Sequence, residues 1–172
     1  SNGDCPMSTL SVDTIQGKTT AGTVAMPAGA VLQVVEGTAV TAYQCFTNTS
    51  LADTGIEVDI TPKFTSSNVL VFVDVQGIYH NTVNQDGKFE LYRDSTELSK
   101  LSGIAGHATT GDENTTESSV HAVFLDTAVS TTSEVTYKVR VKTGSGSCCI
   151  NNYTGGANNV TRSNITVMEI AG

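Results

Sequence analysis

The chain has 172 residues, a formal net charge of −8 at pH 7 and only 15% charged residues. This acidic balance argues against nucleic-acid binding, because the phosphates would be repelled at long range. No apolar run approaches the roughly 18 residues that a membrane-spanning helix needs, so we expect no membrane insertion. Thr and Val fill 26 and 20 positions, and β-branched residues in such numbers favour an all-β protein.

Residues 1–37 are expected to form an extended N-terminal segment. Between residues 8 and 35 the apolar side chains stand singly, and glycines and Pro27 interrupt them. Such a segment cannot bury a core of its own, so we expect an intertwined stalk of identical chains. A floppy linker of similar composition is the alternative. Residues 38–172 are expected to form one head domain.

Nine later segments predict β-strands, because apolar and polar residues alternate in them and turn residues separate them. These segments are residues 41–47, 55–61, 68–80, 87–93, 95–101, 118–127, 134–142, 147–153 and 163–170. Asp86-Gly87 predicts a tight hairpin, and residues 93–96 and 143–147 predict further turns. No apolar stripe of helical period is present. The pattern predicts an antiparallel two-sheet sandwich of the jelly-roll type.

Three of the predicted strands, residues 68–80, 118–127 and 163–170, are apolar on both faces. A sandwich strand normally keeps one face wet. We therefore expect the outer face of one sheet to be covered by further copies of the chain, with a thicker monomeric core as the alternative. The candidate interface residues are Leu70, Phe72, Val123, Leu125, Met168 and Ile170.

Two strands carry charges of opposite sign on their polar faces. The basic residues are Lys138, Arg140 and Lys142, and the acidic ones are Glu57 and Asp59. We expect the two stripes to face one another across neighbouring strands or across subunits. Each exposed pair would contribute about 0.2–1 kcal/mol and would mainly set register. The rival interpretation is an anion-binding patch for acidic bacterial polysaccharide.

The sequence contains no motif of a nucleophile elbow, a zinc-binding helix or a phosphate loop, so we predict no enzyme, no cofactor and no metal. The acidic stretch 107–118 lacks the ligand spacing of a calcium loop and is expected to be a solvated loop. Two Asn- and Tyr-rich loops, 77–87 and 151–159, suit sugars or polar surfaces, with plain hairpin connections as the alternative. The candidate receptor contacts are Tyr79, His80, Asn81, Asn84, Asn151, Asn152, Tyr153 and Asn158.

The four cysteines are Cys5, Cys45, Cys148 and Cys149. A bond between neighbouring Cys148 and Cys149 would be strained, because strand neighbours point to opposite faces. A bridge from Cys45 to one of them and fully free thiols both stay open. A zinc site has little support, since the chain has no Cys-x-x-Cys pair.

The segments MPAGAVLQVV, LYRDST, LDTAVSTTSEVTYKV and a closing MEI follow one another along the chain. Their order resembles the small structural and tail-fibre proteins of marine tailed bacteriophages, over residues 8–170. The resemblance implies a trimer in which a thin stalk leads into a β-sandwich head, without catalysis or cofactor. Trimeric heads of the tumour-necrosis-factor and complement type share this plan but are secreted.

The resemblance further implies a virion protein made in the bacterial cytoplasm, where free thiols are the default. The N-terminal segment would bind other virion proteins, and the head would attach to a bacterial surface receptor. A capsid decoration protein without a receptor site is the first alternative. A polysaccharide-cleaving tailspike is the second, but it usually needs a long parallel β-helix and a carboxylate pair, for which this chain is too short.

Overall fold

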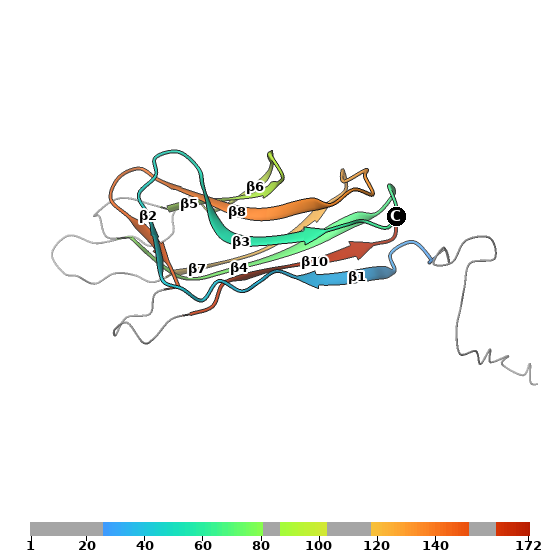
Figure 1. Ribbon diagram of the computed structural model, residues 1–172, viewed down its shortest axis with the longest axis horizontal. Helices are drawn as coiled ribbons and strands as arrows, with labels where there is room; N and C mark the ends of the chain where they lie inside the picture. The colour runs from blue at the N-terminus through green and yellow to red at the C-terminus, as the bar shows by residue number, and fades with distance from the viewer. Residues whose placement is uncertain (1–25, 81–86, 103–117, 152–160) are drawn as a thin grey trace, which may run out of the picture.

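The computed structural model describes residues 26–80, 87–102, 118–151 and 161–172, which form two stacked antiparallel β-sheets (Figure 1). The strands in these residues are β1 (Val31–Glu36), β2 (Gln44–Phe46), β3 (Ala52–Ile60), β4 (Asn68–His80), β5 (Gly87–Arg93), β6 (Thr96–Ser102), β7 (Ser118–Asp126), β8 (Val135–Thr143), β9 (Cys148–Ile150) and β10 (Asn164–Ile170). The prediction of an all-β sandwich is confirmed. Each of the nine predicted strands overlaps one of β2 to β10.

The larger sheet has the order β1-β10-β4-β9-β2, with β7 also paired to β4, and the smaller sheet has the order β3-β8-β5-β6. In Figure 1 the smaller sheet lies over the β1, β10, β4 and β7 part of the larger one. The short strand β2 lies at the opposite end of the molecule from the C-terminus. The two ends of the sandwich therefore present different strands to their surroundings.

The core forms where the apolar positions of both sheets meet. On the larger sheet Val35, Val167, Val71 and Phe124 are successive cross-strand partners, and they pack in or against the buried cluster. The smaller sheet contributes aliphatic side chains together with Phe89 and Tyr137. Alternation along each strand places every second side chain in this layer, as period-2 patterning requires.

The domain boundary predicted after residue 37 does not hold for residues 31–36. These residues form β1, which pairs with β10 from Val31 to Glu36 with a bulge after Val31. The backbone N–H of Gly29 also donates to the carbonyl of Ala171, 2.7 Å away. Leu32 and Val35 are half-buried here, and Val35 packs against the core, so this part of the N-terminal segment belongs to the sandwich. Residues 1–25, which hold most of the predicted stalk, lie outside the described residues.

The hairpin predicted at Asp86-Gly87 is wrong, because β4 belongs to the larger sheet and β5 to the smaller one. Asp86 itself lies outside the described residues. The turn predicted at residues 93–96 is confirmed as the β5–β6 hairpin, in which Asp94 has a φ of 52°. A left-handed φ of this kind is tolerated by Asp better than by most residues.

A buried carboxylate ties the two sheets together. Asp126, at the end of β7 in the larger sheet, pairs with Arg93 of the smaller sheet and accepts a 2.9 Å hydrogen bond from the Tyr137 hydroxyl. Burial, followed by the charge of Asp126, raises the pKa of Tyr137 well above its ordinary value of 10.0. Each polar group in this cluster is satisfied by another, as a buried charge requires.

A second buried carboxylate, Glu169, lies near Asp126 at the end of the sandwich where β10 ends. Glu169 on β10 is fully buried and accepts hydrogen bonds from Gln33 Nε2 at 2.6 Å, Lys63 N at 2.7 Å and Ser67 Oγ at 2.6 Å. Glu169 and Asp126 flank Val69 in one row across the larger sheet. These two networks fix the end of the sandwich at which β10 ends.

Candidate functional site

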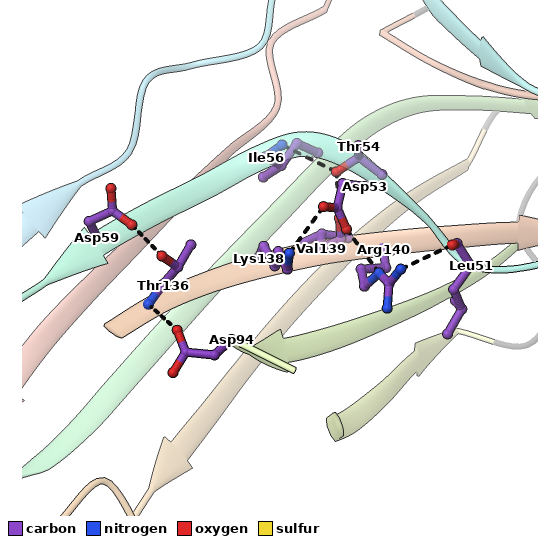
Figure 2. Close-up of polar contacts among 10 residues, drawn as sticks. All are labelled: Leu51, Asp53, Thr54, Ile56, Asp59, Asp94, Thr136, Lys138, Val139 and Arg140. Carbon is purple, nitrogen blue, oxygen red and sulfur yellow. Dashed lines mark hydrogen bonds and ion pairs between the residues drawn. The ribbon is translucent and has the colours of Figure 1, made fainter. Parts of the chain in front are cut away.

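The outer face of the smaller sheet carries the basic stripe, and its partners lie in the same chain. Asp53 on β3 contacts Lys138 Nζ at 3.0 Å and Arg140 Nε at 2.9 Å, the second as an ion pair without hydrogen-bond geometry. Figure 2 shows Asp53 between these two side chains. Arg140 Nη2 also donates to the carbonyl of Leu51 at 3.1 Å. One carboxylate therefore serves two of the three predicted bases.

The acidic residues predicted to hold this stripe are placed beside it but make different contacts. Glu57 is the direct cross-strand partner of Lys138, yet the ion pair of Lys138 goes to Asp53. Asp59 accepts a 2.5 Å hydrogen bond from Thr136 Oγ1, as Figure 2 shows. The expected juxtaposition of the two strands is present, and the expected pairings are not.

A β-bulge explains the change of partners. The β3–β8 register shifts between Asp53 and Glu57, where Gly55 takes a φ of +78°. Thr54 is buried there, and its hydroxyl donates to the carbonyl of Val139 at 2.8 Å. A bulge re-aims the side chains beside it. Asp53 is thereby brought within reach of both Lys138 and Arg140, and the sequence pattern gave no sign of this.

The other flank of the stripe is compensated by β5. Lys142 Nζ lies 3.2 Å from Glu90 Oε1, and the Arg140 guanidinium lies 5.0 Å from the centre of the Tyr92 ring. Burial, and then the charge of Glu90, raise the pKa of Tyr92. All three bases thus have acidic partners on neighbouring strands. This arrangement weakens the rival interpretation of an anion-binding patch, because an anion would have to displace these carboxylates.

The outer face of the larger sheet is apolar instead. Val34, Met168, Leu70 and Leu125 are successive cross-strand partners on β1, β10, β4 and β7. Their inward-facing neighbours fill the core, so this row points outward. The side chains of Val34 and Leu125 are 55% and 49% exposed. We call this set of four residues the apolar row.

The remaining candidate interface residues extend the apolar row. Phe72 on β4 is half-buried, and its partner Val123 on β7 is 65% exposed. Ile170 on β10 is half-buried and lies opposite Val31. All six predicted residues therefore share one sheet face. Sequence reasoning missed Val34 and Val31, because their segment was assigned to the stalk.

The predicted receptor contacts separate into three groups. His80 and Asn151 are buried, so neither can be an exposed contact. His80 Nε2 lies 2.7 Å from Thr143 Oγ1, while the Asn151 amide donates to the carbonyls of Val40 and Ala42. Tyr79 is half-buried on β4. The other predicted contacts, Asn81, Asn84, Asn152, Tyr153 and Asn158, lie outside the described residues.

Cys45 on β2 and Cys149 on β9 are direct cross-strand partners and form a disulfide. The free thiols that the resemblance implies are therefore wrong for this pair, and the alternative of a bridge from Cys45 is confirmed. Cys148 is buried and takes no part in this disulfide. The Tyr43 hydroxyl lies 3.3 Å from Cys149 Sγ, and the Tyr43 side chain is 50% exposed. Sequence reasoning did not single out Tyr43. The available signal was that Tyr43 lies two residues before Cys45, which is on a short strand.

Within the described residues no group of three His, Cys, Asp or Glu side chains could hold a metal ion.

A hollow of about 350 Å³ lies between β1 and β3, and its lining residues include Glu36, Glu57 and Asp59. Glu36 is already paired with Arg162 at 2.9 Å. The acidic stretch 107–118 lies outside the described residues except for Ser118. No helix that could cross a membrane is found in the part of the chain that the structure describes.

Comparison with protein-family models and with curated proteins found no match for this chain. The resemblance to bacteriophage fibre proteins therefore stays a prediction.

Proposed function

We propose that this chain is a non-enzymatic bacteriophage virion fibre protein, whose sandwich head assembles as a homotrimer and attaches to the host surface. The observation that carries this proposal is the difference between the two outer faces. The smaller sheet presents charges that are paired within the chain, and the larger sheet presents the apolar row, Phe72 and Val123. A contiguous exposed apolar patch within a polar rim marks an interaction surface.

A jelly-roll topology is part of the proposal. With the short strands β2 and β9 set aside, the larger sheet pairs β1-β10-β4-β7 and the smaller pairs β3-β8-β5-β6. Eight strands in two four-stranded antiparallel sheets fit a jelly roll. Virion proteins and trimeric heads use this plan, so the topology supports the resemblance seen in the sequence.

A second copy is the occupant that fits the larger sheet best. The apolar row crosses four strands, and a polar rim with Asp74, His121 and Glu36 borders it on the same face. An apolar centre within a polar rim is the usual anatomy of a protein–protein interface. Three copies packed by this face would bury it around a threefold axis and leave the charged sheets in water.

The position on the virion is tested by labelling phage particles with antibody fragments against the head and imaging them by electron microscopy. The proposal predicts labels on tail fibres and binding of the purified protein to host cells. Labels on the capsid with no cell binding would favour the alternative of a decoration protein. Release of reducing sugar from host envelope would contradict the non-enzymatic assignment.

A further inference from the structure

Two tyrosines lie beside the disulfide on the outer face of the larger sheet. Tyr79 on β4 is the direct partner of Cys149 on β9, and Cys149 is the direct partner of Cys45 on β2. Directly opposed side chains of an antiparallel pair share one face. The Tyr43 hydroxyl donates to Cys149 Sγ at 3.3 Å. Tyr43 and Tyr79 therefore flank the Cys45–Cys149 bond.

Tyr43 is open to solvent but anchored on both sides. The residue is 50% exposed. Just before it, the Asn151 amide donates to the carbonyls of Val40 at 3.0 Å and Ala42 at 3.1 Å. Just after it, Cys45 is bonded to β9. Partial burial, followed by the nearby Tyr79 phenol, raises the pKa of Tyr43. A ring held in this way loses little conformational entropy when a ligand stacks on it.

The sequence segments that hold these tyrosines and the disulfide carry no charge. The segments 37–52, 75–79 and 143–151 contain no Asp, Glu, Lys, Arg or His, although the chain has a net charge of −8. They are rich in hydroxyl and amide groups. A charged ligand would find no counter-charge in these segments. A neutral polyhydroxylated ligand would find the two tyrosine rings to stack on and hydroxyl and amide groups as hydrogen-bond partners.

We propose that Tyr43, Tyr79 and the Cys45–Cys149 disulfide form a binding platform for a neutral sugar ring, with the disulfide holding Tyr43 in place. The C–H face of a pyranose stacks on the exposed Tyr43 ring, and the phenol hydroxyls bind sugar hydroxyls. This inference rests on the proposed attachment function and names its ligand class. Tyr79 lies nine residues along β4 from Leu70, or about 30 Å, so one trimer can use both surfaces.

The test is an NMR titration of the full oxidised chain with ring-labelled tyrosines. The probes are the methyl glycosides of glucose, galactose, mannose and N-acetylglucosamine, with glucuronic acid as the anionic comparison. We expect at least one neutral glycoside to shift the Tyr43 and Tyr79 ring signals at millimolar concentration. The buried Tyr92 and Tyr137 rings should not move, and glucuronic acid should bind more weakly. No shift with any neutral glycoside, or stronger binding of glucuronic acid, overturns the proposal.

Variants then locate the site. Tyr43→Ala should weaken binding about tenfold, the effect of losing one good aromatic contact. Tyr43→Phe keeps the ring and should stay within about threefold of the native chain, since a net hydrogen bond contributes little more. Thr132→Ala, in an exposed turn between β7 and β8, is the matched control and should bind normally. Native affinity in Tyr43→Ala would overturn the site.

Reduction tests the role of the disulfide. Reduction with dithiothreitol should weaken sugar binding, and so should the double change Cys45→Ser and Cys149→Ser. The oxidised Tyr43→Phe variant should retain sugar binding and serves as the control. Unchanged affinity after reduction overturns the claim that the bond positions Tyr43. The mass of each sample in solution shows whether it is a trimer, and so separates the assembly proposal from the sugar-binding proposal. A trimer without sugar binding refutes only this inference, and a monomer that binds sugar refutes only the assembly.

Discussion

Met168 on β10 lies directly opposite Leu70 on β4, and both side chains point away from the core. Val34 and Leu125 continue this row to the flanking strands. On the other sheet the same outward position is filled by Lys138, which is paired with Asp53. One sandwich therefore has an outer face suited to water and an outer face suited to a partner, and this asymmetry underlies the proposed assembly.

Replacing exposed apolar side chains with charge should separate the subunits without unfolding them. For Leu125→Lys with Val123→Lys we expect a monomer, because burying two unpaired ammonium groups in an interface is strongly unfavourable. The free energy of unfolding of the monomer should change by less than about 0.5 kcal/mol, since both side chains are exposed in the single chain. Sedimentation velocity and urea denaturation measure the two quantities. A trimer that survives this change would place the interface elsewhere, and Thr132→Lys is the control.

Asp53 should matter more to stability than Glu57. Asp53→Asn removes ion pairs with Lys138 and Arg140, whereas Glu57→Gln removes no ion pair that the described residues show. Exposed pairs contribute about 0.2–1 kcal/mol each, so we expect a loss of about 1 kcal/mol for Asp53→Asn and almost none for Glu57→Gln. The loss should shrink at high salt because these groups are partly exposed. Urea denaturation in low and high salt gives both values, and equal losses would contradict this geometry.

Asp126 should be among the most costly residues to remove. Asp126→Ala leaves Arg93 without its buried partner and Tyr137 without its acceptor, so we expect a loss of about 3–5 kcal/mol. Tyr137→Phe removes one hydrogen bond and leaves the ion pair, so its expected loss is about 1 kcal/mol. The free energies of unfolding in urea test this order. The reverse order would mean that Asp126 does not link the sheets.

Stability should fall in alkaline solution because of the buried Tyr137. Its folded-state pKa lies well above the ordinary 10.0 of the unfolded chain, so its stabilising effect is complete below pH 10 and decreases as the pH rises beyond that value. The unfolded state then releases a proton that the folded state retains. Tyr137→Phe should show a shallower fall between pH 9 and 11 on the urea midpoint. Parallel profiles for both proteins would rule out this cause.

The disulfide should secure β2 more than the rest of the fold. β2 has three residues, and among the described strands it pairs only with the equally short β9. The bond closes a 104-residue separation, for which chain entropy sets an upper estimate of about 4.7 kcal/mol. After reduction we expect fast amide hydrogen exchange in β2 with protection retained in β4 and β10. Uniform loss of protection would show instead that the bond supports the whole sandwich.

The positions of β2 to β10 followed from the sequence, because alternation and β-branched residues act locally. Asp53 did not, since its reach depends on the bulge at Thr54 and Gly55. β1 was missed because it is recognisable only beside β10. His80 and Asn151 were read as loop residues, whereas their polar groups are satisfied by residues distant in sequence, namely Thr143, Val40 and Ala42. Tertiary pairing of this kind leaves little trace in a single sequence.

The mass of the purified chain in solution, measured by light scattering after size exclusion, tests the assembly most directly. One copy has a mass of 17.9 kDa, and the apolar row together with Phe72 and Val123 predicts a species three times as heavy. A stable 17.9 kDa species at every concentration, with Leu125 and Val123 open to solvent, would contradict the account.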